Sequence, residues 1–133
     1  MKKIYIIGII ILSIIILSIL TYKEDVVYDK FTKVKIENNP FDFGTINATD
    51  TIKHIFKITN TTNTLFVIDK VLPSCTCTVS KADKKICKKG ESTNVEVTFI
   101  PNKKQKNDIN TVVFIQCNAE KGVLKLKLTG KIK

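Results

Sequence analysis

Hydrophobic and polar residues divide this sequence into two unlike parts at about residue 22. Before that point the chain is almost uniformly apolar, with a run from Ile4 to Leu20 that follows Lys2 and Lys3. After it, apolar and polar residues alternate in short stretches separated by Asn, Asp, Thr, Pro and Gly, which is typical of β-strands. The pattern predicts an N-terminal apolar helix followed by an all-β domain.

The apolar run predicts a helix that crosses a membrane. Its roughly seventeen residues exceed the core of a signal peptide and reach the lower limit for a bilayer span. The exit, residues 18–22, lacks the small residues of a cleavage site. We therefore expect residues 1–22 to be a transmembrane anchor that contacts the membrane through residues 4–22, with a cleaved signal peptide and a secreted protein as the alternative. Lysines before a span stay in the cytoplasm, so the rest of the chain is expected in the periplasm or outside the cell.

Residues 23–33 show no sustained period and are expected to form a tether. Residues 34–133 carry about seven short strands at regular spacing, which predicts an antiparallel β-sandwich of the immunoglobulin type. Pro40 places the strand after it at a sheet edge or makes it a strand start, whereas the apolar residues on both faces of 109–117 predict a central strand. The expected strands and short extended pieces are Val34–Ile36, Phe41–Gly44, Ile52–Ile58, Leu65–Val71, Thr76–Ser80, Val95–Phe99, Ile109–Cys117 and Val123–Leu128.

Charge and motif content argue against several classes of function. The chain has 22 basic and 12 acidic residues, and every basic residue is Lys. Lys lacks the bidentate fork with which Arg reads phosphate and guanine, so we expect no specific binding of nucleic acid. His54, the only histidine, alternates with Phe56 and Ile58 and is expected to be a strand residue rather than a general base. No phosphate loop or nucleophile elbow is present, so no catalytic residue, bound metal or cofactor is expected.

Four cysteines carry the candidate chemistry: Cys75 and Cys77 directly after Pro73, and Cys87 and Cys117 farther along the chain. An exported domain meets oxidising conditions, and an even count favours disulfides. Because the Cα atoms of residues i and i+2 in a strand lie roughly 6.5–7 Å apart, at the outer limit for a bridge, we expect a motif cysteine to pair with Cys87 or Cys117 instead.

Three alternatives for the cysteines remain open. The motif thiols could be inert, with one facing the core. They could bind Cu(I), or all four cysteines could enclose Zn. They could also form a reactive redox pair, whose thiol pKa values the lysines at positions 84, 85, 88 and 89 would lower if they lay nearby.

A set of spaced motifs resembles a known bacterial family. The motifs are Phe41-Asp42-Phe43-Gly44, Phe56-Lys57-Ile58-Thr59-Asn60, Ser74-Cys75-Thr76-Cys77-Thr78, Lys89-Gly90-Glu91 with Val95–Phe99, Cys117-Asn118 and Leu128-Thr129-Gly130. Over residues 36–132 the chain resembles domain of unknown function 1573, common in Bacteroidetes and related to the Hydin-like and major-sperm-protein-like immunoglobulin domains. The resemblance implies an immunoglobulin-like sandwich that is secreted or membrane-attached and has no assigned enzymatic activity.

The chain departs from the family pattern around its cysteines. The family usually has Gly where this chain has Thr76 and Pro where it has Lys89, and Cys87 and Cys117 are additional. We expect a non-enzymatic, extracytoplasmic binding or structural module with a protein partner and with the Cys75–Cys77 loop at its functional end. The competing hypothesis is a thiol-redox or soft-metal protein that uses the same loop.

Overall fold

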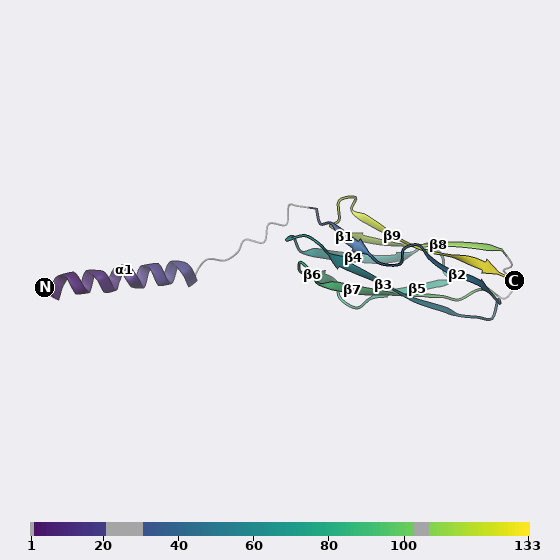
Figure 1. Ribbon diagram of the computed structural model, residues 1–133, viewed down its shortest axis with the longest axis horizontal. Coiled ribbons are helices and arrows are strands. Elements are labelled where there is room, and N and C mark those ends of the chain that lie inside the picture. Colours follow the sequence, from purple (N-terminus) through teal and green to yellow (C-terminus); the bar gives the residue numbers. More distant parts are fainter. Residues whose placement is uncertain (1, 21–30, 103–106) are drawn as a thin grey trace.

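The computed structural model describes residues 2–20, 31–102 and 107–133 (Figure 1). Within them are one helix and nine strands. Their bounds are α1 (Lys2–Leu20), β1 (Val34–Ile36), β2 (Phe41–Ile46), β3 (Ile52–Asn60), β4 (Phe66–Pro73), β5 (Thr78–Ala82), β6 (Ile86–Cys87), β7 (Ser92–Phe99), β8 (Asp108–Cys117) and β9 (Val123–Ile132). Most of the tether expected at 23–33 lies outside the described residues.

The prediction of a transmembrane helix was wrong. Among the described residues, no helix is both long and apolar enough to cross a membrane. Helix α1 has 19 residues, of which Lys2 and Lys3 are the first two. At 1.5 Å per residue its apolar part rises about 25 Å, less than the roughly 30 Å hydrocarbon core of a bilayer.

The strands form two sheets that face each other. One has four strands in the order β1-β3-β7-β5, and the other has five in the order β2-β9-β8-β4-β6. Alternate residues of each strand point inward, as the sequence pattern predicts, and meet in one core between the sheets. Its largest fully buried side chains are Phe56, Phe66, Phe99, Ile58, Ile68, Ile115, Leu126, Leu128, Ile132, Val95, Val97 and Val113.

The sheet topology refines the expected arrangement of strands. Strand β8 lies between β9 and β4 and is central, and β2, which follows Pro40, is an edge strand; the sequence indicated both positions. However, β2 runs parallel to β9, so the sandwich is not antiparallel throughout. The lysine-rich connection after β5 contains the short strand β6, which pairs with the start of β4.

The motif Leu128-Thr129-Gly130 ends in glycine because the ring of Phe43 on β2 lies directly against that position. A Cβ added at Gly130 would overlap the Phe43 ring, so the ring occupies the space that a side chain on β9 would need. The same ring stacks on Phe99 of the opposite sheet, with a centroid distance of 5.8 Å. The motif residues Phe43 and Gly130 therefore fix β2 against both sheets.

Candidate functional site

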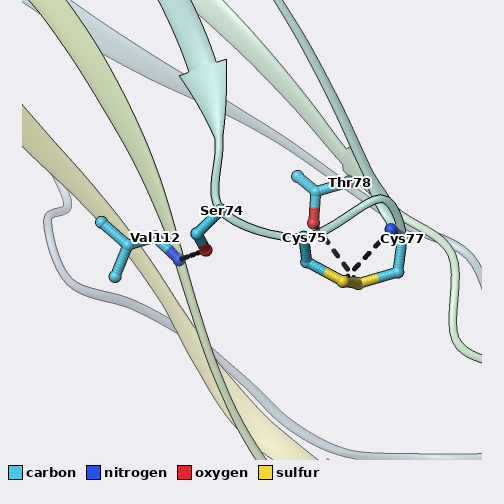
Figure 2. Close-up of a disulfide and its surroundings, with 5 residues drawn as sticks. All are labelled: Ser74, Cys75, Cys77, Thr78 and Val112. Atoms are coloured by element: carbon cyan, nitrogen blue, oxygen red, sulfur yellow. Dashed lines mark hydrogen bonds between the residues drawn. A yellow bond between two sulfur atoms is a disulfide. The ribbon is translucent and has the colours of Figure 1, made fainter.

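The cysteine motif forms the loop that carries the chain from one sheet to the other. Strand β4 of the five-stranded sheet ends at Pro73, and β5 of the four-stranded sheet begins at Thr78. Ser74 ties the loop to β8: its N–H donates to Val112 O at 2.8 Å, and its Oγ accepts from Val112 N at 3.1 Å (Figure 2). At the other end, Ile100 N donates to Cys77 O at 2.8 Å. Each sheet thus holds one end of the loop.

Between these anchors the chain makes a tight turn that Cys75 and Cys77 close with a disulfide (Figure 2). Thr78 N donates to Cys75 O at 3.1 Å, which is the hydrogen bond of a β-turn. The turn brings the two Cα atoms to 5.1 Å, whereas an extended strand would hold them farther apart. Thr76 keeps a negative φ, so this turn does not need the glycine that the family usually has there.

The disulfide lies at the surface. Both cysteines are half-buried, and Ser74 and Thr76 are exposed. The backbone N–H of Cys77 donates to Cys75 Sγ at 3.1 Å, and Thr78 Oγ1 lies 3.9 Å from Cys77 Sγ (Figure 2). The two sulfur atoms therefore have different polar environments.

Cys87 and Cys117 are free thiols at the other end of β4. Cys87 pairs with Phe66 and Cys117 with Ile68, while the motif follows Pro73. Since a strand rises about 3.3 Å per residue, about 16 Å of β4 separates Ile68 from Pro73. No bridge between the motif and either thiol fits that distance, and the structure does not contain the pairing that we expected.

Cys87 and Cys117 are also separated from each other. They lie on opposite sides of β4, in β6 and β8, and two strand spacings amount to about 10 Å. The four cysteines do not come together, and within the described residues no three His, Cys, Asp or Glu side chains form a group that could hold a metal ion.

Burial raises the pKa of both free thiols. Cys87 is fully buried, and this effect outweighs the opposite effect of the Lys84 charge. The pKa of Cys117 is raised by its burial, although backbone hydrogen bonds oppose the shift. Cys117 lines an open depression of about 450 Å³ together with Val67 and Val123. Neither thiol is activated as a nucleophile.

The lysines that the sequence suggested would lower the pKa values of the motif thiols lie near Cys87 instead. Lys85 O accepts from Ile68 N at 2.8 Å, which places the connection between β5 and β7 beside the first half of β4. Asp83 holds that connection to β7, where it accepts from Thr93 Oγ1 at 2.7 Å and from Asn94 N at 2.9 Å. Burial alone would raise the pKa of Asp83, but these hydrogen bonds together lower it.

His54 faces the interior of the sandwich, as its alternation with Phe56 predicts. It stacks on Phe41 with a centroid distance of 3.6 Å and meets Phe56 edge-on at 4.6 Å. Burial lowers the pKa of His54, and its buried Nε2 has no hydrogen-bond partner. The side chain is a neutral part of the packing between the sheets.

Sequence reasoning missed a second feature beside the loop, which is the free edge of β5. This strand pairs with β7 on one side, and within the described residues no strand pairs with its other side. The pattern of residues 78–82 shows a strand but contains no signal for its position in a sheet.

Comparison with known proteins connects this architecture to a family. Residues 34–132 match the family model described as "Protein of unknown function (DUF1573)". The chain belongs to this family. The match confirms the resemblance seen in the spaced motifs and covers both sheets. No curated protein matches the sequence.

Solved structures of other proteins show a similar fold. A protein of unknown function from Porphyromonas gingivalis W83 has a TM-score of 0.68 at 16% identity, and the match covers 83% of this chain and 51% of that one. The PapD-like domain 7 (ASH / PapD-like) of human CEP192 has a TM-score of 0.54 at 16% identity, with coverages of 77% and 87%.

The secreted serine protease VesC from Vibrio cholerae has a TM-score of 0.58 at 12% identity, with coverages of 77% and 23%. This chain thus spans about half of the Porphyromonas protein and about a quarter of VesC. At these identities the likeness establishes the fold alone, which is immunoglobulin-like and PapD-like. Such a fold suggests a binding or structural module.

Proposed function

We propose that this chain is an exported, non-enzymatic module that binds an extended segment of a protein partner along the free edge of β5. A strand that adds to a sheet edge gains affinity from main-chain hydrogen bonds and specificity from alternate side chains. The observation that carries the proposal is the outward row of backbone groups on β5, which no other strand pairs with in the described ranges 31–102 and 107–133.

Two hydrogen bonds fix which backbone groups of β5 face β7. Ile100 N donates to Cys77 O at 2.8 Å, and Asp83 N donates to Asn94 O at 3.0 Å. Backbone groups of successive residues in an antiparallel strand point alternately toward the partner strand and away from it. The odd-numbered positions between Cys77 and Asp83 therefore bond to β7.

The even-numbered residues Ser80 and Ala82 consequently direct their N–H and C=O groups away from β7. Their side chains face the core, while those of Val79 and Lys81 face outward. Val79 is 61% exposed. A partner strand would meet two donors and two acceptors beside an apolar side chain and a cationic one.

The other sheet edges are less suited to strand addition. Strand β1 has three residues and β6 has two. Strand β2 has six residues, but its pairing is irregular between Asp42 and Thr45. Short and bulged edges resist pairing with another chain. The five residues of β5 are the longest regular edge in the described part of the chain.

The Cys75–Cys77 disulfide supports export, because disulfides persist in oxidising compartments. The proposed location is outside the cytoplasm, with the sandwich of residues 34–133 as the binding domain.

Photo-cross-linking in the host that expresses the chain tests this proposal. A photoreactive residue replaces Val79, whose side chain lies on the outer face beside the free edge. The same residue at Lys125 on the central strand β9 is the matched control. We expect a defined adduct from position 79 and none from position 125.

Ser80→Pro supplies the decisive variant. Proline removes the outward N–H of Ser80 but no hydrogen bond to β7, so we expect a folded protein that loses the adduct. Val79→Pro removes an N–H that bonds to β7 and should destabilise the sheet. This variant checks which backbone groups of β5 face β7 and which face its free edge. Adduct formation that survives Ser80→Pro in the folded protein, or no adduct at position 79, would refute strand addition at this edge.

A further inference from the structure

We propose that the Cys75–Cys77 disulfide is a thiol–disulfide exchange site that accepts two electrons from a dithiol of a partner protein. This redox reaction goes beyond binding at β5 and does not depend on it. The motif disulfide reacts as a stoichiometric oxidant, which is compatible with a non-enzymatic module. The proposal rests on a half-exposed disulfide in a loop whose position is set by other bonds, and on the unequal surroundings of its two sulfur atoms.

The loop does not need the disulfide to keep its place. Backbone hydrogen bonds hold Ser74 to β8 and Cys77 to the residue after β7, and the bond from Thr78 N to Cys75 O closes the turn. The disulfide links residues only two apart in sequence and thus constrains a very short segment. The disulfide and dithiol forms can therefore share one backbone, as a reversible exchange site requires.

The hydrogen bond at Cys75 gives the exchange a direction. Cys77 N–H donates to Cys75 Sγ at 3.1 Å. A hydrogen bond to a thiolate stabilises the charged form and makes that sulfur the better leaving group. Cys77 Sγ, which has only the distant Thr78 hydroxyl at 3.9 Å, is the sulfur that an incoming thiolate attacks.

The electron and atom balance is that of two displacements. A partner thiolate attacks Cys77 Sγ, a mixed disulfide forms, and the bond to Cys75 breaks, so that Cys75 leaves as a thiolate and takes a proton from water. The partner's second thiolate then attacks its own sulfur in the mixed disulfide, and Cys77 leaves and is protonated. The partner dithiol is oxidised to a disulfide, and the Cys75–Cys77 pair is reduced to two thiols.

The other cysteines of the chain do not interfere with this exchange. Cys87 is buried and Cys117 half-buried, and burial raises the pKa of each. Both free thiols lie beside the first half of β4, whereas the motif loop begins after Pro73, the last residue of β4. A mixed disulfide on Cys77 is therefore resolved only by Cys75 or by the partner.

Glutathione redox buffers test the exchange on the full chain. The folded protein is equilibrated at a series of ratios of reduced to oxidised glutathione, quenched, alkylated and mapped by peptide mass, while circular dichroism monitors the fold. We expect the motif pair to change reversibly from disulfide to dithiol with the far-ultraviolet spectrum unchanged. A disulfide that stays oxidised in the folded protein at a hundredfold excess of reduced glutathione would overturn the proposal and leave a structural bond.

Single-cysteine variants test the assigned direction. In a Cys117→Ser background, Cys77→Ser leaves Cys75 with the hydrogen bond from the residue 77 N–H, and Cys75→Ser leaves Cys77 with only the Thr78 hydroxyl at 3.9 Å. We expect Cys75 to be alkylated severalfold faster than Cys77 at pH 6, because the hydrogen bond from Cys77 N–H stabilises the Cys75 thiolate and raises its population. Equal rates, or faster alkylation of Cys77, would contradict the leaving-group assignment. The Cys75→Ser/Cys77→Ser double variant serves as the folding control.

Discussion

At the scale of single residues, the inward face of the sandwich accommodates side chains that are not purely apolar. His54 occupies an interior position of β3 that an aliphatic residue could fill, and Phe41 and Phe56 contact its ring. Ser80 on β5 likewise has a buried hydroxyl without a hydrogen-bond partner. Both residues pair with Val97 of β7 from opposite sides. The polar atoms thus lie in one row across the four-stranded sheet.

His54 should make stability depend on pH. Burial lowers its pKa below the ordinary 6.5, so the unfolded state binds a proton first as the pH falls. The stabilisation that comes from keeping His54 neutral is present in full above pH 6.5. It is lost as the pH falls from there through the folded-state pKa of His54. Urea unfolding at pH 7.5 and pH 5.5 should show a lower free energy of unfolding at pH 5.5.

His54→Phe is the matched control for this prediction, because the chain has no other histidine. The variant keeps an aromatic ring between Phe41 and Phe56 but cannot titrate. We expect it to remove most of the difference between the two pH values. An equal pH dependence in both proteins would mean that another group is responsible.

At the scale of elements, the loop between β4 and β5 shows how a turn changes the chemistry of a sequence motif. The sequence prediction treated the motif as an extended strand, in which the Cα atoms of Cys75 and Cys77 would lie too far apart for an unstrained disulfide. The bond from Thr78 N to Cys75 O folds it into a turn, and the Cα separation drops to 5.1 Å. Local hydrogen bonding decided the pairing of the cysteines, and this is the property that a residue pattern predicts least well.

Removal of the Cys75–Cys77 bond should cost little stability. In the loop-entropy description, a closed loop of three residues stabilises a protein by about 1.6 kcal/mol, less than the 3 kcal/mol typical of a fifteen-residue loop. We expect Cys75→Ser/Cys77→Ser to lower the free energy of unfolding by no more than about this amount. Denaturant unfolding measures the difference, and a loss several times larger would show that the bond is a main support of the sandwich.

At the scale of the whole molecule, β4 separates two groups of cysteines. Its first half lies beside Cys87 and Cys117, and its end leads into the motif. The rigid strand between them prevents the cross-links that the even number of cysteines suggested. The disulfide and the two free thiols therefore belong to different ends of the sandwich.

Thiol counting on the full chain checks this partition. We expect one disulfide between Cys75 and Cys77, alkylation of Cys117 in the native protein, and alkylation of Cys87 only after unfolding, because its side chain is fully buried. Cys117→Ser should abolish labelling of the native protein. A disulfide that joins the motif to Cys87 or Cys117 would contradict the arrangement.

The sequence by itself determined most of the β architecture. The alternation in β3, β7 and β9 identified the buried faces, because side chains of a strand alternate between its two sides. Pro40 indicated an edge strand, and the spaced motifs indicated DUF1573, which the family model confirmed. The apolar N-terminal run predicted a helix correctly, but its assignment as a membrane span was wrong.

Only the tertiary structure decided how distant parts of the chain meet. The parallel pairing of β2 with β9, the free edge of β5 and the positions of Cys87 and Cys117 along β4 all depend on strand order. Alternation gives the face on which each side chain lies but contains no information on which strands become neighbours. The candidate chemistry of this chain depends on those neighbours, since they determine which thiols can meet and which backbone groups stay unpaired.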